Sequence, residues 1–485
     1  MRKYWMKKTR EQNVFMVFLL LVFMLVGGGC EKFVDVTPPE TSLTGDNVFK
    51  DDASANAVLL GVYTNMSSGI IFSSSFAGVS LFAGLSADEL TPFKENIDVL
   101  MLQYYTNNLQ GAQIANRQEF WSNIYQTIYV VNAALDGLNK STNLNPSVKK
   151  QLLGESRFIR AFCYFYLTNM YGDVPVVTSI DYSINASLPR SSQADVYSLI
   201  ISDLILAKEL LNSTYVDGGG VNKTTERVRP SKHTAAALLA RVYLYRGMWK
   251  EASQEADFVI SNSSMYQLET DLSKVFLKNS AEAIWQLQPT NVGENTQFGI
   301  GFVLTAGFKG GLNPVYLSNN IVNDFEKGDL RRKYWVGIDS STGKKYYYSY
   351  KYKQYEFGQP ITEYAVVMRL AEQYLIRAEA RLHLGNLTGA SNDLNELRRR
   401  SGLPVTAAET LAELDNAILK ERKTEFFTEW GHRWFDLKRT KKIDQVMSII
   451  TPQKGGVWST HAQLYPISWV ELLKTPSITQ TPGYK

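Results

Sequence analysis

The sequence predicts a mainly α-helical protein: a scaffold of tetratricopeptide-like helix pairs that carries long irregular loops and a small β element. Three observations support this fold class. Apolar residues recur at helical spacings over long stretches, two segments repeat one pattern of small residues, and a tyrosine-rich segment alternates as a strand does.

The longest helical patterns lie in the first half of the chain. Apolar residues fall mainly three and four positions apart over 121–138, and a second such pattern covers 152–170. Asn145-Pro146 marks the break between them. After an irregular connector, a further helix is expected over 195–211.

Two later segments repeat the same spacing of small residues, with steps of 7, 5 and 4. They are Ala240, Gly247, Ala252 and Ala256, and then Ala378, Gly385, Ala390 and Leu394. Small side chains let two helices approach closely, and glycine suits the turn between them. The spacing therefore resembles a tetratricopeptide helix pair, and two ordinary helical hairpins remain the alternative.

The β element is expected between these two segments, at 282–288 and 333–357. Four tyrosines alternate there with other residues, namely Tyr346, Tyr348, Tyr350 and Tyr352. Such alternation is typical of a strand that faces two environments. Residues 340–343 would form its hairpin turn.

The amino end has the layout of an export signal. Five basic residues precede an unbroken apolar run of 13 residues at 14–26, and three glycines then lead to Cys30. A membrane-spanning helix needs about 20 apolar residues, so the run suits a cleaved signal better than a permanent anchor. We expect residues 1–29 to be removed, residues 30–46 to form a polar tether, and residues 47–485 to form a single domain.

Cys30 directly follows the apolar run and the small residues, which resembles the lipobox of bacterial lipoproteins. The resemblance implies that Cys30 becomes the first residue of the mature chain and carries the lipid. Gly27 departs from the pattern, because leucine is commonest there, and a plain signal with an incidental cysteine is the alternative. The only other cysteine, Cys163, lies in an apolar run, so stability should come from a core rather than from disulfides.

The formal net charge of +4 belongs to the segment expected to be removed. Residues 1–29 hold five basic residues and one acidic residue, and the rest of the chain holds 46 of each kind. A neutral mature protein has no general positive field, so we expect no nucleic-acid partner.

Short characteristic segments follow one another in a fixed order along the mature chain. They are 33–38, Asn47-Val48-Phe49, Ala87-Asp88-Glu89, Arg160-Ala161-Phe162, Tyr171-Gly172-Asp173-Val174-Pro175, Pro189-Arg190-Ser191, 240–244, Arg377-Ala378-Glu379-Ala380, Trp434-Phe435-Asp436-Leu437, 464–467 and 479–484. Each segment alone is weak, but their order over some 450 residues is specific, and with it the mature chain resembles the SusD/RagB family of outer-membrane nutrient-binding lipoproteins.

The resemblance implies a surface-exposed protein of the outer membrane, held there by lipid. It implies a partner, a SusC-like TonB-dependent transporter, over which the protein acts as a lid, and oligosaccharide as the commonest cargo. It also implies an N-terminal part of about 47–230 and a C-terminal part of about 231–485. From the spacings alone, only the helical scaffold follows.

A sugar-binding site needs flat rings that stack on C–H faces and polar groups that bind hydroxyls. Residues 67–106 show no clear helical period, so we expect a long region of loops there. The family tends to place ligand contacts in this region. The candidate ligand-binding residues are Asp88, Phe93, Asn96, Tyr104 and Tyr105, with Trp335 in reserve. Packing within the loop or against the scaffold is the alternative for each ring, and Trp285 is expected to be buried.

No residue pattern points to catalysis. Glu421, Glu425 and Glu429 recur every four residues, which places them on one helix face. Glu429 and Arg433 would form an i,i+4 ion pair on that face. We therefore expect these acids to have a structural use rather than a role in glycoside cleavage. The four histidines never pair at metal-ligand spacing, and no cofactor motif occurs. A calcium ion at Asp88-Glu89 is the one metal alternative.

The predicted function is therefore a non-enzymatic, cell-surface protein that binds oligosaccharide for a transporter. A helical-repeat scaffold that binds a peptide or protein partner is the alternative from another class. A lipoprotein glycosidase is disfavoured, because the sequence offers no catalytic site.

Overall fold

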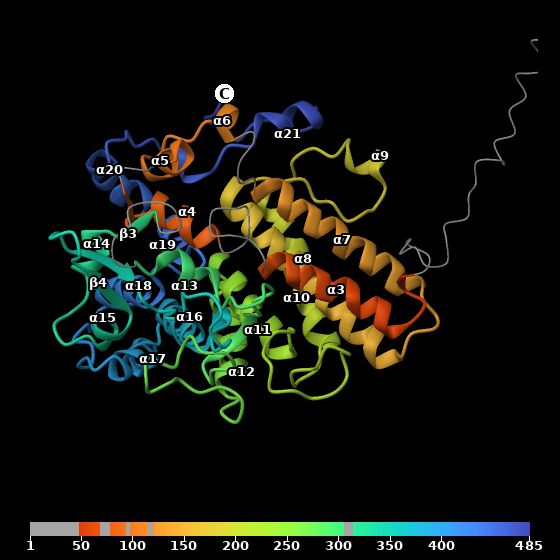
Figure 1. The fold of residues 1–485 in the computed structure, drawn as a ribbon, viewed down its shortest axis with the longest axis horizontal. Coiled ribbons are helices and arrows are strands. Elements are labelled where there is room, and N and C mark those ends of the chain that lie inside the picture. The colour runs from red at the N-terminus through yellow and green to blue at the C-terminus, as the bar shows by residue number, and fades with distance from the viewer. Residues whose placement is uncertain (1–47, 68–77, 94–97, 115–119, 305–313) are drawn as a thin grey trace, which may run out of the picture. The chain divides into compact units, whose positions relative to one another are not determined.

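The computed structural model describes residues 48–67, 78–93, 98–114, 120–304 and 314–485. They are mostly helical, as predicted (Figure 1). The helices are α3 (Asp52–Ser67), α4 (Gly78–Ser86), α5 (Val99–Tyr105), α6 (Gly111–Ile114), α7 (Phe120–Lys140), α8 (Pro146–Tyr171), α9 (Tyr182–Asn185), α10 (Gln193–Leu210), α11 (Lys232–Tyr245), α12 (Trp249–Ile260), α13 (Gln297–Phe302), α14 (Asn319–Val322), α15 (Leu330–Tyr334), α16 (Leu370–His383), α17 (Leu387–Arg400), α18 (Leu411–Phe426), α19 (His432–Arg439), α20 (Ile443–Gln453) and α21 (Trp469–Lys474).

Helix α8 is the central element of the core, packed between α7 and α10 (Figure 1). The predicted break before it is confirmed: the Asn145 side chain accepts a hydrogen bond from the Ser147 amide, and Pro146 occupies the first turn. Nearly every residue from Phe158 to Tyr171 is buried, Cys163 among them. The apolar run that contains the cysteine is thus core, and not a disulfide site.

The two segments with repeated small residues form two helical hairpins, α11–α12 and α16–α17. Gly247 and Gly385 lie in the turns with φ of 68° and 80°, a left-handed conformation that glycine adopts without strain. The other residues of the pattern are fully buried: Ala240, Ala252, Ala256, Ala378, Ala390 and Leu394. Helix α12 packs on α16, and α18 continues the stack, so the predicted tetratricopeptide-like scaffold is confirmed.

The strands form three two-stranded antiparallel sheets: β1 (Leu90–Pro92) with β3 (Val315–Leu317), β2 (Ala283–Leu287) with β6 (Ala365–Arg369), and β4 (Val336–Asp339) with β5 (Tyr346–Ser349). The predicted hairpin is confirmed, with Val336 opposite Ser349. Its strands are shorter than expected, because Lys333 belongs to α15 and the strand ends at Ser349.

The segment predicted to be irregular, 67–106, instead contains α4, β1 and α5. Helix α4 is buried along its whole length, so it shows no polar face and no amphipathic period in the sequence. In the described part of the chain, no helix combines the length and the apolar character needed to cross a membrane. The predicted signal segment, Cys30 and the tether lie outside the described residues.

Candidate functional site

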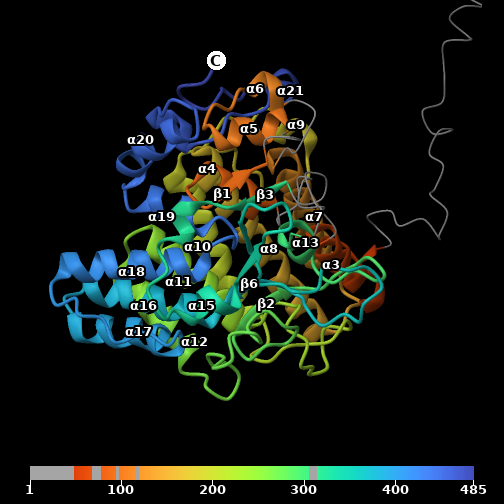
Figure 2. The ribbon, with the colours of Figure 1, turned by 60° about the vertical axis from the view of Figure 1, so that its left-hand side comes forward.

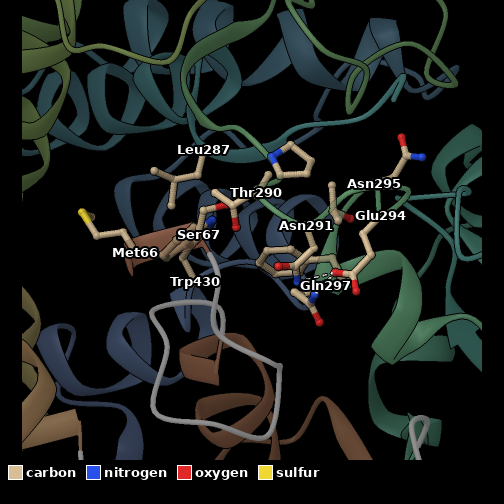
Figure 3. A pocket seen from close by; sticks show the side chains of 13 residues that line it. Met66, Ser67, Leu287, Thr290, Asn291, Glu294, Asn295, Gln297 and Trp430 are labelled. Carbon is tan, nitrogen blue, oxygen red and sulfur yellow. Dashed lines mark hydrogen bonds between the residues drawn. The ribbon is translucent and has the colours of Figure 1, made fainter. Parts of the chain in front are cut away.

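A shallow hollow opens where five segments meet: the end of α3, the end of β2 with the loop after it, the start of α13, β6, and the loop between α18 and α19 (Figure 3). Met66 and Ser67 contribute from α3, and Leu287 closes β2. The loop 288–296 supplies one wall and then enters α13, where the side chain of Thr296 caps the helix by accepting a hydrogen bond from the Gly299 amide.

The wall of the hollow carries a set of joined polar groups. The amides of Asn291 and Gln297 each donate a hydrogen bond to Oε2 of Glu294, both at 2.8 Å (Figure 3). Asn291 is exposed, and Glu294 and Gln297 are half-buried, so all three present atoms to solvent. Two donors therefore hold one carboxylate in a fixed orientation, and it retains acceptor capacity for a ligand hydroxyl.

The side chain of Asn295 holds the loop 288–296 in place. Its side chain donates to the Pro360 carbonyl at 3.1 Å and accepts from the amides of Thr362 and Glu363. These bonds fasten the loop to the segment before β6. The polar wall is thus supported by a second layer of hydrogen bonds, which makes it rigid.

Aromatic rings complete the lining. Phe298 packs against Tyr352 with ring centroids 5.1 Å apart, and Trp430 lies 6.1 Å from Phe298. Trp430 adopts a left-handed backbone conformation with φ of 48°, and its indole nitrogen donates to the Val366 carbonyl at 2.7 Å. A strained backbone held by its surroundings is typical of functional regions. Phe298 and Trp430 are only 3% and 2% exposed, so they form the buried part of the lining below the polar groups that reach solvent.

A second group of rings forms at the sheet edges. Phe93, Tyr316 and Tyr346 lie on or beside β1, β3 and β5, and the ring centroids of Phe93 and Tyr316, of Phe93 and Tyr346, and of Tyr316 and Tyr346 are each 5.0 Å apart. Phe93 is buried, whereas Tyr316 and Tyr346 are half-buried. Chain position alone could not reveal this group, because Phe93 lies more than 200 residues from the two tyrosines in sequence.

Tyr104 and Trp335 were expected to offer their rings to a ligand, but neither ring is exposed. Tyr104 is 2% exposed, because it lies on the inner face of α5 against Phe82 and Tyr465. Trp335 is fully buried, and its indole nitrogen donates to the Leu272 carbonyl at 2.8 Å. Both rings are core residues in this structure.

The other candidate rings lie nearer to the surface. Tyr105 is half-buried, with the Lys454 ammonium 5.2 Å from its ring centroid. Asn96 lies outside the described residues. Ligand contact by Phe93, Asn96 and Tyr105 stays a prediction. Trp285 is fully buried, as expected.

Asp88 is a structural ion-pair residue. Its buried carboxylate accepts hydrogen bonds from Lys423 at 2.8 Å and from Arg433 at 2.8 and 3.0 Å. Burial would raise the pKa of Asp88, but the charges of Arg433 and Lys423 outweigh it and hold that pKa well below its usual range. Among the described residues, no cluster of three metal-ligating side chains occurs.

The neighbouring Glu89 is in a different state. Burial, followed by the negative charge of Asp88, raises the pKa of Glu89 to about 8. Within the described structure its Oε1 atom has no hydrogen-bond partner. The pair thus consists of one carboxylate and one carboxyl group that is protonated at neutral pH.

The acidic series at the C-terminal end has a structural use, as predicted. Glu421 and Glu425 both bind Arg331, and Glu425 and Glu429 both bind Arg369, in ion pairs that are buried throughout. The expected pairing of Glu429 with Arg433 is wrong. Helix α18 ends at Phe426, and left-handed residues follow, so Glu429 leaves the helix face and turns toward Arg369.

Comparison with known proteins agrees with this geometry. A family model described as "Starch-binding associating with outer membrane" matches residues 80–244, and the model of the SusD family matches residues 176–484. The chain belongs to the SusD family. The SusD-like protein P2 of Formosa agariphila is 27% identical over 529 aligned residues, which cover 96% of this chain and 99% of the relative.

Solved structures of SusD proteins share the fold. A SusD superfamily protein from Bacteroides vulgatus superimposes with a TM-score of 0.76 at 24% identity, covering 90% of this chain and 100% of that structure. A structure named as a laminarin binding SusD-like protein gives a TM-score of 0.75, also at 24% identity, with the same coverage. The mainly helical SusD fold therefore extends over nearly the whole described chain.

Proposed function

We propose that this chain is a lipid-anchored, surface-exposed protein that binds oligosaccharide and delivers it to a SusC-like TonB-dependent transporter in the outer membrane. Membership of the SusD family supports the proposal, as does the family model described as starch-binding and associated with the outer membrane. A structural relative is named for binding laminarin, a glucan.

The observation that carries the proposal is the set of joined polar groups in the wall of the hollow. Sugars present many hydroxyl groups, so they bind where hydrogen-bonding groups are already oriented. Here Asn291, Glu294 and Gln297 are joined by hydrogen bonds and reach solvent, while Phe298 and Trp430 form the buried part of the lining. A carboxylate already bound by two amides can accept hydroxyl donors without losing side-chain freedom, which lowers the entropic cost of binding.

Binding rather than catalysis fits the acidic residues. Glycoside cleavage uses two carboxyl groups that flank the scissile bond. Glu421, Glu425 and Glu429 are each buried in ion pairs with arginines, so none of them faces a ligand space. Glu294 lies in the hollow with amides as its hydrogen-bond partners. We therefore propose a protein without enzymatic activity.

The experiment is isothermal titration of the mature protein with oligosaccharides of laminarin and of starch. Glu294→Ala removes the shared acceptor, and a hydrogen bond to a charged group is worth about 1.5–3 kcal/mol, so affinity should fall roughly tenfold or more. Glu396→Ala is the matched control, because Glu396 is an exposed acid on α17 paired with Arg399. Equal affinity in both variants and the wild type would contradict this site.

A further inference from the structure

Residues 330–353 are far more basic than the rest of the chain. They hold seven basic residues and one acidic residue, whereas residues 30–485 as a whole hold 46 of each kind. The segment begins with α15, which lies beside the stacked helices α16, α17 and α18 in both Figure 1 and Figure 2, and it continues into the β4–β5 hairpin. A local excess of one charge raises the local concentration of oppositely charged ligands.

Most of these cations reach the surface of the segment. Arg331 and Lys351 are the exceptions, because both are buried in ion pairs with glutamates of α18 and its following loop. The single acid, Asp339, accepts hydrogen bonds from Ser341. The remaining cations are exposed or half-buried, and within the described part of the chain none of them forms an ion pair: Arg332, Lys333, Lys344, Lys345 and Lys353. The segment therefore presents a net positive surface.

Three half-buried tyrosines form a row on one face of the hairpin. Side chains alternate along β5 and the residue after it, so Tyr346, Tyr348 and Tyr350 share a face. Ser349 points the other way, toward the scaffold, where its hydroxyl group is hydrogen-bonded to that of Thr428. The ring centroids of Tyr348 and Tyr350 are 5.8 Å apart. We call these three rings the tyrosine row.

The tyrosine row is supported by the hairpin and bounded by lysines. An added Cβ on Gly337 of β4 would come within 2.2 Å of the Tyr348 ring, so this ring lies directly on the β4 backbone. The Lys344 ammonium is 5.0 Å from the centroid of the first ring of the row, and the Lys353 ammonium is 4.8 Å from that of the last. A paired strand thus presents rings and cations together, in fixed positions.

This combination of groups matches the chemistry of an acidic oligosaccharide. Sugar rings stack their C–H faces on aromatic rings, and carboxylate or sulfate groups accept charge-assisted hydrogen bonds from ammonium groups. The hollow has the opposite character, because its fixed acceptor is the carboxylate of Glu294, which repels an acidic group. A lipid bilayer fits less well, since membrane-surface segments insert exposed apolar side chains, and Ile338 is the only large apolar residue exposed within 330–353.

We infer that the tyrosine row, together with Lys344 and Lys345, is a second glycan-binding surface, and that it takes an oligosaccharide carrying carboxylate or sulfate groups. The inference rests on the proposed function for the kind of ligand, a glycan. It adds a binding surface and a charge class that the hollow does not provide: neutral units bind in the hollow, and acidic units bind on the tyrosine row.

The test is isothermal titration of the mature protein with oligogalacturonate, which carries carboxylates, with oligosaccharides of a sulfated galactan, and with neutral laminarin oligosaccharides. At least one acidic probe should bind, and the probe that binds identifies the acidic group. The double variant Lys344→Gln with Lys345→Gln should lower the affinity for that probe roughly tenfold or more and leave laminarin affinity unchanged. The matched control is Lys223→Gln with Lys250→Gln, because both lysines are exposed but lie outside 330–353. Equal losses in the two double variants overturn the inference.

The rings are tested separately from the charges. Tyr348→Ala should lower the affinity for the acidic probe roughly tenfold or more, because it removes a stacking surface. Tyr348→Phe keeps the ring and should keep the wild-type affinity. The melting temperature of each variant shows whether its fold is intact. Wild-type affinity in Tyr348→Ala, or an equal loss in Tyr348→Phe, overturns the role of the tyrosine row.

The outcomes separate this inference from the proposed site in the hollow. If laminarin binds and neither acidic probe does, the inference is overturned and the hollow stands. If an acidic probe binds with the expected losses and no neutral glycan does, the tyrosine row stands and the assignment of the hollow fails. Single-stranded DNA and phosphatidylglycerol vesicles should bind more weakly than the acidic probe, and tighter binding of either one overturns the inference.

Discussion

Asp88 accepts two hydrogen bonds from the guanidinium of Arg433, from Nε at 2.8 Å and from Nη2 at 3.0 Å. The two residues are 345 positions apart, so this contact joins the start of the first sheet to α19. Lys423 of α18 donates to the same carboxylate. One acid thus joins three elements and compensates the charge of Arg433, while Lys423 also pairs with Asp324.

Asp88→Asn should lower the free energy of unfolding by about 3 kcal/mol, because it leaves the buried Arg433 without its carboxylate and Lys423 with Asp324 alone. Urea denaturation at pH 7 measures the change. The control is Asp136→Asn, whose pair with Lys140 is exposed and should be worth about 0.5 kcal/mol or less. Equal losses in the two variants would show that the Asp88 contacts do not stabilise the fold.

Glu89 should make stability depend on pH near neutrality. Its folded pKa of about 8 lies above the unfolded value of about 4.3, so the folded state holds a proton that the unfolded state has lost. The stability that protonated Glu89 contributes to the folded state is therefore complete at low pH and is lost as pH rises toward 8. Glu89→Gln should gain stability relative to the wild type between pH 5 and pH 8, at up to about 1.4 kcal/mol per pH unit. A difference that stays constant across that range, as expected for Glu396→Gln, would refute the assignment.

Trp335→Ala should destabilise the protein by about 3–5 kcal/mol, because it empties a fully buried site and leaves the Leu272 carbonyl without its donor. The melting temperature measures the effect. Tyr105→Ala should cost clearly less, since that ring is half-buried. A Trp335 variant that keeps its melting temperature but loses glycan affinity would restore Trp335 as a ligand residue.

Gly385→Ala should destabilise by about 1 kcal/mol, solely through the backbone. Its φ of 80° is unfavourable for alanine, while the space around an added Cβ is open. Gly61→Ala is the matched control, because Gly61 also has open space but lies inside α3. There alanine favours the helix and should stabilise by up to about 1 kcal/mol. The same sign in both thermal melts would contradict the role of the turn.

Cys30→Ala should release the protein from membranes, because we propose that Cys30 carries the lipid. Fractionation followed by immunoblotting measures the distribution between membrane and soluble fractions. A variant that remains membrane-bound after normal processing of its precursor would rule out this anchor.

The parts of the fold that depend on local spacing could be predicted from the sequence. Small residues and a glycine at fixed steps are typical of a close-packed helix pair, so the pairs α11–α12 and α16–α17 could be predicted from this spacing. Helix α4 was missed, because it is buried on every side and has no period to reveal it. Exposure of Tyr104 was also misjudged, since a short helix turns that ring inward against Tyr465.

The candidate site could not be predicted, because it depends on contacts between distant segments. Glu294 and Gln297 are ordinary loop residues in the sequence, and only the fold places Met66 and Trp430 beside them. The signal available was weak: a polar stretch rich in amides, 290–297, between two apolar ones. Ion pairs between residues 60 or more positions apart, such as Arg369 with Glu429, leave no local pattern at all.

The order of the buried charges along the chain has a consequence for biogenesis. Arg331, Arg369 and Arg400 all precede Glu425, the acid that they share. Two other buried partners, Asp329 and Glu282, are synthesised earlier or beside them. The network of buried charges is therefore complete only when Glu425 has been made, and a buried cation that lacks part of its compensation is unfavourable. The C-terminal half consequently reaches its full stability late in synthesis.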